Sequence, residues 1–278
     1  MPRSIITGVI DIKAENVNQD VQIINSYENY NRLLEGDEVD DKDPLNDENE
    51  ITNYTEIKID NNPINFAYTY KFDQSKTYKI EYSFDEKLTK ANCMFSNCEL
   101  LTELDFSSFN PGNLIGMFGM FDSCSSLKSL TLSYFNTQNV RNMSCMFLRC
   151  ESLKNLDLSN FNTQNVTDMK SMFGGCKSLE NLNLSDFNTQ NVINMGLMFA
   201  HCDSLTNLNL SNFNTQNVTD MGGMFAHCDS LTNLDLSNFN TKNATNMNKM
   251  FGDCELLKIN NIITNDQKIL KEFENLKH

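Results

Sequence analysis

Residues 178–203 read SLENLNLSDFNTQNVINMGLMFAHCD, and this stretch decides the fold. Within it, Met198 and Phe199 are followed three positions later by Cys202, and this pattern occurs seven times along the chain. The cysteines of the seven copies lie 26 residues apart, at Cys98, Cys124, Cys150, Cys176, Cys202, Cys228 and Cys254. A constant period without insertions indicates one structural unit copied along the chain.

Each unit combines two hydrophobic periods. Leu182 and Leu184 flank Asn183, and this alternation predicts a short strand with one buried face. A second apolar set follows at a spacing that predicts about two helical turns: Val192, Met195, Met198, Phe199 and Cys202. One strand and one short helix cannot bury their own apolar faces, but stacked copies can. We therefore predict an α/β repeat solenoid, leucine-rich-repeat-like, with a parallel sheet on one side and short helices on the other.

The repeat also carries a family resemblance. Leu179-x-x-Leu182-x-Leu184 resembles the start of a leucine-rich repeat. The continuation Leu-Ser-x-Phe-Asn-Thr-x-x-Val-x-x-Met-x-x-Met-Phe-x-x-Cys resembles the 26-residue repeat of BspA-like leucine-rich-repeat surface proteins, over about residues 92–262. This resemblance implies a solenoid at the cell surface that is used for adhesion or protein contact, and it supplies no catalytic residues.

Three parts are predicted along the chain. Residues 1–91 alternate in the manner of strands, including a hairpin of residues 9–12 with 21–24, and we predict a small β domain that caps the repeats. Residues 92–262 hold the seven repeats. Residues 263–278 place Ile269 and Phe273 at helical spacing, which predicts a C-terminal capping helix.

An acidic loop, residues 35–50, carries nine Asp or Glu residues and one Lys. It lacks the glycine and the closing glutamate of an EF-hand loop, so we interpret it as a solvated loop of the N-terminal domain. A loose calcium site and a contact for a basic partner stay open as alternatives.

The cysteine series allows three interpretations: metal ligands, disulfides or buried free thiols. Zinc is disfavoured because no CxxC pair occurs, and disulfides are disfavoured because stacked side chains point the same way. We predict core thiols, in a reducing compartment or too deeply buried to oxidise. Cys93 and Cys145 fall outside the series and are interpreted as incidental, and His201 and His227 as copies within duplicated text rather than a metal site.

Composition excludes several functional classes. The chain has 278 residues and a net charge of -15, which argues against nonspecific nucleic-acid binding. No run of 18 apolar residues predicts a membrane span. Residues 1–9 lack the features of a signal peptide, which predicts a cytoplasmic location, whereas the family resemblance implies the cell surface. No phosphate loop or nucleophile–His–acid set is found, so we predict no enzyme activity, no cofactor and no metal.

The predicted function is a non-enzymatic protein-interaction module that presents a polar concave sheet to a protein or peptide partner, with a glycan as a further possibility. Its partner-binding residues are those that point outward between the buried leucines of the strands: Asn155, Asp157, Asn181, Asn183, Asn207, Asn209, Asn233 and Asp235. Two alternatives stay open: these residues only keep the sheet soluble, or the protein is a BspA-like adhesin. The oligomeric state is left undetermined.

Overall fold

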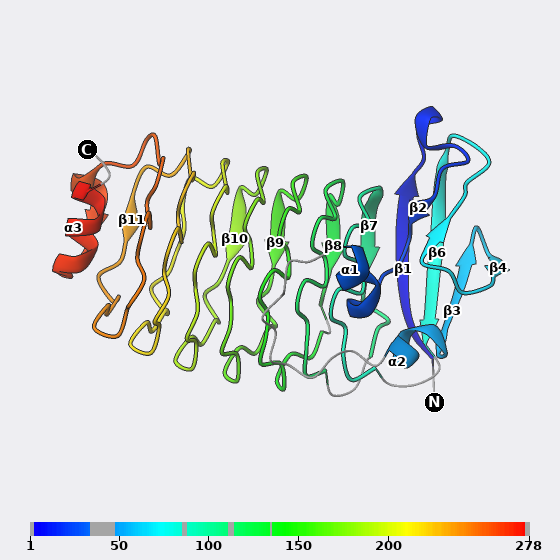
Figure 1. Ribbon diagram of the computed structural model, residues 1–278, viewed down its shortest axis with the longest axis horizontal. Coiled ribbons are helices and arrows are strands. Elements are labelled where there is room, and N and C mark those ends of the chain that lie inside the picture. The colour runs from blue at the N-terminus through cyan, green and yellow to red at the C-terminus, as the bar shows by residue number, and fades with distance from the viewer. Residues whose placement is uncertain (1–2, 34–47, 85–87, 111–113, 134, 276–278) are drawn as a thin grey trace.

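The computed structural model describes residues 3–33, 48–84, 88–110, 114–133 and 135–275. The 26-residue repeats form chain turns, hereafter coils, that lie side by side in a row (Figure 1). Strands from the N-terminal region stand at one end of the row, and helix α3 (Gln267–Asn275) stands at the other. The predicted acidic loop lies outside the described residues, apart from its last positions, where helix α2 (Glu48–Thr52) begins.

The N-terminal strands and the first two coils share one six-stranded sheet. Its order is β4-β3-β6-β1-β7-β8. The six strands have these bounds: β1 Ser4–Asp11, β3 Thr55–Ile59, β4 Asn62–Ile64, β6 Thr77–Phe84, β7 Leu101–Asp105 and β8 Ser129–Thr131. The sheet therefore crosses the predicted boundary between residues 91 and 92, and the division into domains itself stays a prediction.

The predicted hairpin of residues 9–12 with 21–24 is wrong. Strand β1 pairs antiparallel with β6 on one side and with β7 on the other. Strand β2 (Val21–Gln22) instead pairs with β5 (Thr69–Tyr70), and a 3-10 turn at Ala14–Asn16 separates β1 from β2. These partners are far apart in sequence, so the alternation of residues alone could not select them.

The predicted fold class is also wrong in its sheet. A leucine-rich-repeat-like solenoid would carry one continuous parallel sheet, whereas the six-stranded sheet is mostly antiparallel and only β7 and β8 pair in parallel. Two separate two-stranded parallel sheets follow: β9 (Asn155–Asp157) with β10 (Asn181–Asn183), and β11 (Leu234–Asp235) with β12 (Ile262–Ile263). The segment 206–209 between them belongs to no strand.

The predicted repeat helices are wrong as well, because consecutive turns occupy those positions. The Met198 N–H bonds to the Met195 carbonyl within its coil at 3.3 Å, but the Phe199 N–H bonds to the Met224 carbonyl of the next coil at 2.9 Å. An α-helix would direct each N–H to the carbonyl four residues earlier. Leu197 and His201 both have φ of 57°, in the left-handed region that a right-handed helix excludes.

Stacking of equivalent residues holds the coils together. The Phe147 and Phe173 rings stack with centroids 5.7 Å apart, and Phe173 stacks on Phe199 at 5.6 Å. Parallel bridges join consecutive coils at equivalent positions, for example Asp168 with Asn194. One cluster of buried apolar residues runs from β1 to α3, so the N-terminal strands, the coils and the last helix share a core.

All nine cysteines are free, as predicted for the core thiols. Each thiol of the series after the first donates to a carbonyl of the preceding coil, as Cys176 Sγ does to the Phe147 oxygen at 3.1 Å. Burial raises the pKa of Cys176 to about 12, so this thiol stays protonated. Cys93 and Cys145 are not incidental: with Phe118 they form the apolar surface on which Tyr27 and Tyr30 of helix α1 (Tyr27–Leu33) pack.

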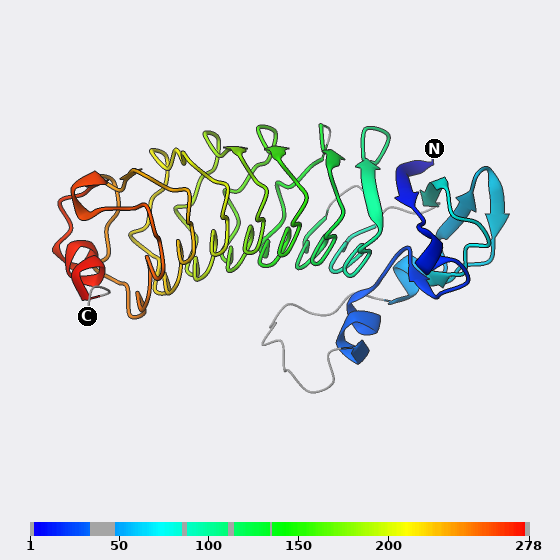
Figure 2. The ribbon, with the colours of Figure 1, turned by 90° about the horizontal axis from the view of Figure 1, so that it is seen from above.

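Two helical segments of the C-terminal region complete the fold. A 3-10 turn at Ile259–Asn261 precedes β12, and α3 buries Ile269 and Phe273 against the last coil (Figure 2). The Phe273 ring packs edge-on against Phe251 with centroids 5.5 Å apart. Among the described residues, no helix is both long enough and apolar enough to cross a membrane.

Candidate functional site

Six of the eight predicted partner-binding residues line one open depression of about 820 Å³. It extends from β8 across β9 and β10 to the segment 206–209. The six are Asn155, Asp157, Asn181, Asn183, Asn207 and Asn209. The other two predicted residues, Asn233 and Asp235, lie at β11 and do not line this depression, although they are exposed as the six are.

Strand geometry explains why these side chains point outward. Leu156 is buried between exposed Asn155 and Asp157, because successive side chains of a strand point to opposite faces. In the parallel pair, Asn181 stands opposite Asn155 and Asn183 opposite Asp157. Equivalent side chains therefore form rows that run across the strands. Within a row, neighbouring side chains come from strands that lie about 4.8 Å apart.

Local hydrogen bonds fix the orientation of one row. Asp157 Oδ1 accepts from the Ser159 N–H at 3.0 Å, and Asn183 Oδ1 accepts from the Ser185 N–H at 3.1 Å. The hydrogen bonds from Ser159 hold the pKa of the Asp157 carboxyl below its usual range, so it is charged at neutral pH. Both side chains are exposed, so a partner can reach them.

The neighbouring row contains a side-chain bond between coils. Asn181 Nδ2 donates to Asn155 Oδ1 at 2.7 Å, which orders both amides. Asn207 Nδ2 instead bonds within its own coil, to Thr206 Oγ1 at 3.3 Å. All three residues of this row are exposed, so a protein or peptide can reach them.

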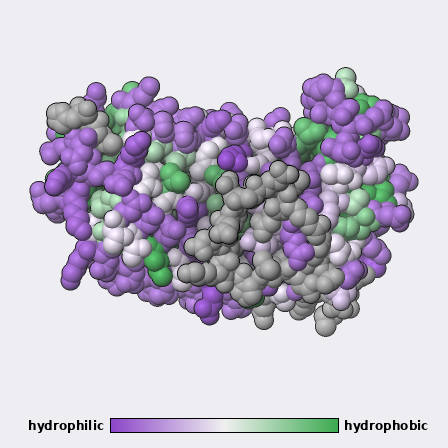
Figure 3. Space-filling model, in the orientation of Figure 1, coloured by the Kyte–Doolittle hydropathy of each residue, from purple (hydrophilic) through white to green (hydrophobic). Residues whose placement is uncertain are grey.

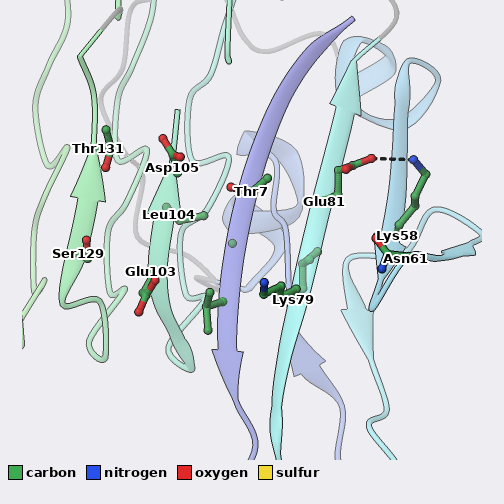
Figure 4. A pocket seen from close by; sticks show the side chains of 13 residues that line it. Thr7, Lys58, Asn61, Lys79, Glu81, Glu103, Leu104, Asp105, Ser129 and Thr131 are labelled. Carbon is green, nitrogen blue, oxygen red and sulfur yellow. Dashed lines mark hydrogen bonds and ion pairs between the residues drawn. The ribbon is translucent and has the colours of Figure 1, made fainter. Parts of the chain in front are cut away.

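A second depression, of about 440 Å³, lies on the six-stranded sheet (Figure 4). Lys58 and Glu81 form an ion pair across it, with Nζ and Oε1 2.7 Å apart. Ser129 lines both depressions, so they adjoin. We call the outward residues of both together the strand face: Thr7, Lys58, Lys79, Glu81, Glu103, Asp105, Ser129, Thr131, Asn155, Asp157, Asn181, Asn183, Asn207 and Asn209.

The sequence analysis missed the N-terminal half of the strand face. Residues 55–59 and 77–84 show the alternation of strands with polar outward positions, which was the available signal. The alternation does not show which strands pair. Thr7 pairs with both Glu81 and Asp105, and this pairing places the N-terminal strands beside the repeats. Lys128 and Glu180 also line the larger depression and were not predicted.

The chemistry of the strand face is hydrogen bonding and charge pairing. Its lining side chains are mainly amides, hydroxyls, carboxylates and lysines, and no His or Cys is among the described residues that line the two depressions. Within the described ranges, no three His, Cys, Asp or Glu side chains are grouped so as to hold a metal ion. The rings of His201 and His227 stack with centroids 4.2 Å apart, away from this face.

Comparison with known proteins identifies the repeat. The family described as "Mycoplasma protein of unknown function, DUF285" matches residues 64–182 and 178–275, which together span more than half of the chain. No curated protein and no solved structure matches this chain. The family match supports a repeat family without singling out BspA-like proteins. The chain therefore belongs to the family of Mycoplasma proteins of unknown function called DUF285.

Proposed function

We propose that the protein is a non-enzymatic protein-interaction module that binds a protein or peptide partner on its strand face. The main support is that six outward residues, chosen from the sequence, line a single depression of about 820 Å³. Two further features support it: Asp157 and Asn183 are oriented by the backbone N–H groups of Ser159 and Ser185, and both side chains are exposed. Side chains held in place lose less entropy on binding.

A binding experiment tests this proposal with the whole chain. Short random peptides displayed on phage are selected on the protein. The affinity of each selected peptide is then measured for a double variant of the strand face and for a control variant. Asn183→Arg with Asn209→Arg fills the depression with two large charged side chains. We expect binding to fall at least tenfold, because these peptides lose both contact surface and hydrogen bonds.

The matched control is Asn248→Arg, at an exposed position away from the strand face. The equivalent position three repeats earlier is Lys170, so the fold accepts a long basic side chain there. Peptides whose binding is lost equally in both variants, or in neither, contradict the proposal. Circular dichroism and the denaturation midpoint of each variant show that the fold is retained.

A second candidate is a cell-surface adhesin, favoured by the resemblance of the 26-residue repeat to BspA-like proteins. The two candidates predict different locations. Immunolabelling of intact and permeabilised cells separates them: signal on intact cells supports the adhesin, and signal only after permeabilisation contradicts it.

A further inference from the structure

The N-terminal strands continue the rows of the repeats. Thr7 stands opposite Glu81 on one side and opposite Asp105 on the other, and Asp105 stands opposite Thr131 of the second coil. Asp157 lies 26 residues after Thr131, at the equivalent position of the third coil. One row of outward side chains therefore runs from the antiparallel strands into the coils, and the two adjoining depressions lie along it.

Charge along this row has one sign once the ion pair of Lys58 with Glu81 is set aside. From Thr7 to Asn209 its charged residues are Asp105 and Asp157, both exposed. In the described part of the chain neither has a lysine or arginine within ion-pair distance. The other two lysines that line the depressions, Lys79 and Lys128, are not part of this row.

We infer that the strand face, including its N-terminal strands, binds an extended polypeptide that lies across the strands and places basic side chains over Asp105 and Asp157. This inference rests on the proposed function. Charge complementarity selects the occupant, because lysine or arginine would pair with two carboxylates that have no basic partner within the described residues. Among the described residues that line the two depressions none is aromatic, so these residues offer a sugar ring no stacking platform.

The spacing of the two carboxylates sets the spacing of the basic residues. Asp105 and Asp157 are two coils apart, or about 10 Å with about 4.8 Å between strands. An extended chain in the polyproline II conformation has three residues per turn and advances about 3.1 Å per residue, so side chains at i and i+3 lie on the same side and span about the same distance. We expect peptides that bind here to carry Lys or Arg at positions i and i+3.

The peptides selected on the whole chain test this inference. We expect enrichment of Lys or Arg pairs at i and i+3, and a loss of affinity of about tenfold in the double variant Asp105→Asn and Asp157→Asn. Asparagine occupies the equivalent positions 183 and 209, so the fold accepts both changes. Asp186→Asn is the control for lost charge, since equivalent positions 160, 212 and 238 also hold Asn.

Thr7→Arg tests the N-terminal strands separately. It adds a basic side chain between Glu81 and Asp105 and should weaken the same peptides about tenfold. Thr245→Arg is its control, because Arg141 holds the equivalent position in an earlier coil.

The outcomes separate this inference from the proposed function. One outcome overturns this inference and leaves the proposed function standing. In it, the selected peptides lose affinity for the Asn183 and Asn209 variant, but they lack basic pairs and bind the variants at residues 7, 105 and 157 with unchanged affinity. Peptides that ignore both sets of variants, or no selected peptides at all, overturn both.

Discussion

Thr189 joins its coil to the next through a pair of reciprocal hydrogen bonds with Asn214. Thr189 Oγ1 donates to the Asn214 carbonyl at 3.1 Å and accepts from the Asn214 N–H at 2.7 Å. The Thr189 side chain is fully buried, and its hydroxyl satisfies both backbone groups of Asn214 at a partly buried contact. The same arrangement recurs at Thr163 and Thr215.

Replacing this hydroxyl is expected to destabilise the protein. Thr189→Val keeps the shape but leaves the N–H and the carbonyl of Asn214 without their partner, at a cost of about 1–3 kcal/mol. Thr189→Ser is the control, because it keeps the hydroxyl and loses one methyl group, for about 1 kcal/mol. Urea denaturation midpoints measure both, and a valine variant as stable as the serine variant would contradict the role given to the hydroxyl.

The left-handed residues allow a test that distinguishes turns from helix. Lys249 is exposed and has φ of 55°. In this conformation a side chain costs about 1–2 kcal/mol, so Lys249→Gly should raise the free energy of unfolding by about 0.5–1 kcal/mol after the entropy of glycine is subtracted. In a helix the same change would lower it by about 1 kcal/mol. Thermal and urea denaturation of the variant give the sign directly.

Gly223 provides the opposite change at an equivalent position. Its φ is 60°, and an added Cβ would lie 2.5 Å from Leu197 Cδ2. We expect Gly223→Ala to destabilise the protein by about 1–2 kcal/mol through the backbone, with a further loss from the contact. A neutral effect of this substitution, measured by denaturation midpoint, would argue against the left-handed turn.

The buried thiols make stability depend on alkaline pH. The pKa of Cys176 rises from 9.0 to about 12 on burial, so between these values the unfolded state loses a proton that the folded state keeps. The contribution of this thiol to the free energy of unfolding is fully present below pH 9. It is lost as pH rises toward 12, by about 1.4 kcal/mol per pH unit. Stability of the protein and of Cys176→Ala, measured from pH 8 to about 10.5, should fall less steeply in the variant; parallel curves would contradict this.

The contact between α1 and the coils also has a pH signature. Tyr30 Oη donates to Asp122 Oδ2 at 2.6 Å. Burial raises the pKa of Asp122, and the bond from Tyr30 opposes that rise. Because a raised carboxyl pKa costs stability as pH rises above its unfolded value of 3.8, removing the bond should cost more at neutral pH than near pH 4.

Tyr30→Phe tests this dependence. We expect a loss of about 1–3 kcal/mol at pH 7 and a smaller loss at pH 4, from urea denaturation at both values. The double variant with Asp122→Asn removes the titrating group, so its loss should be the same at both pH values. A pH-independent loss in the single variant would show that the phenol acts only through packing.

The sequence predicted the repeat and its buried positions but not the backbone that joins them. The period places Met195, Met198 and Phe199 in the core, where the structure has them. The same spacing fits both a helix and consecutive turns. Left-handed residues such as Leu197 distinguish the two, and the sequence signal for that conformation is glycine, which stands at the equivalent position of two other coils as Gly119 and Gly223.

The candidate site was predicted in part for a similar reason. Local alternation identifies outward residues such as Asn183, and six of the eight lie together. The N-terminal half depends on the pairing of Thr7 with Asp105, which joins segments far apart in the chain. Periodicity is a local property and does not contain such pairings.

The measurement closest to the central claim is hydrogen–deuterium exchange of the whole chain with and without a selected peptide. Binding on the strand face predicts slower exchange in residues 103–105, 155–157, 181–183 and 207–209, with no change in the turn segment 197–201. Slower exchange confined to the turn segments, with the strand segments unchanged, would contradict the account.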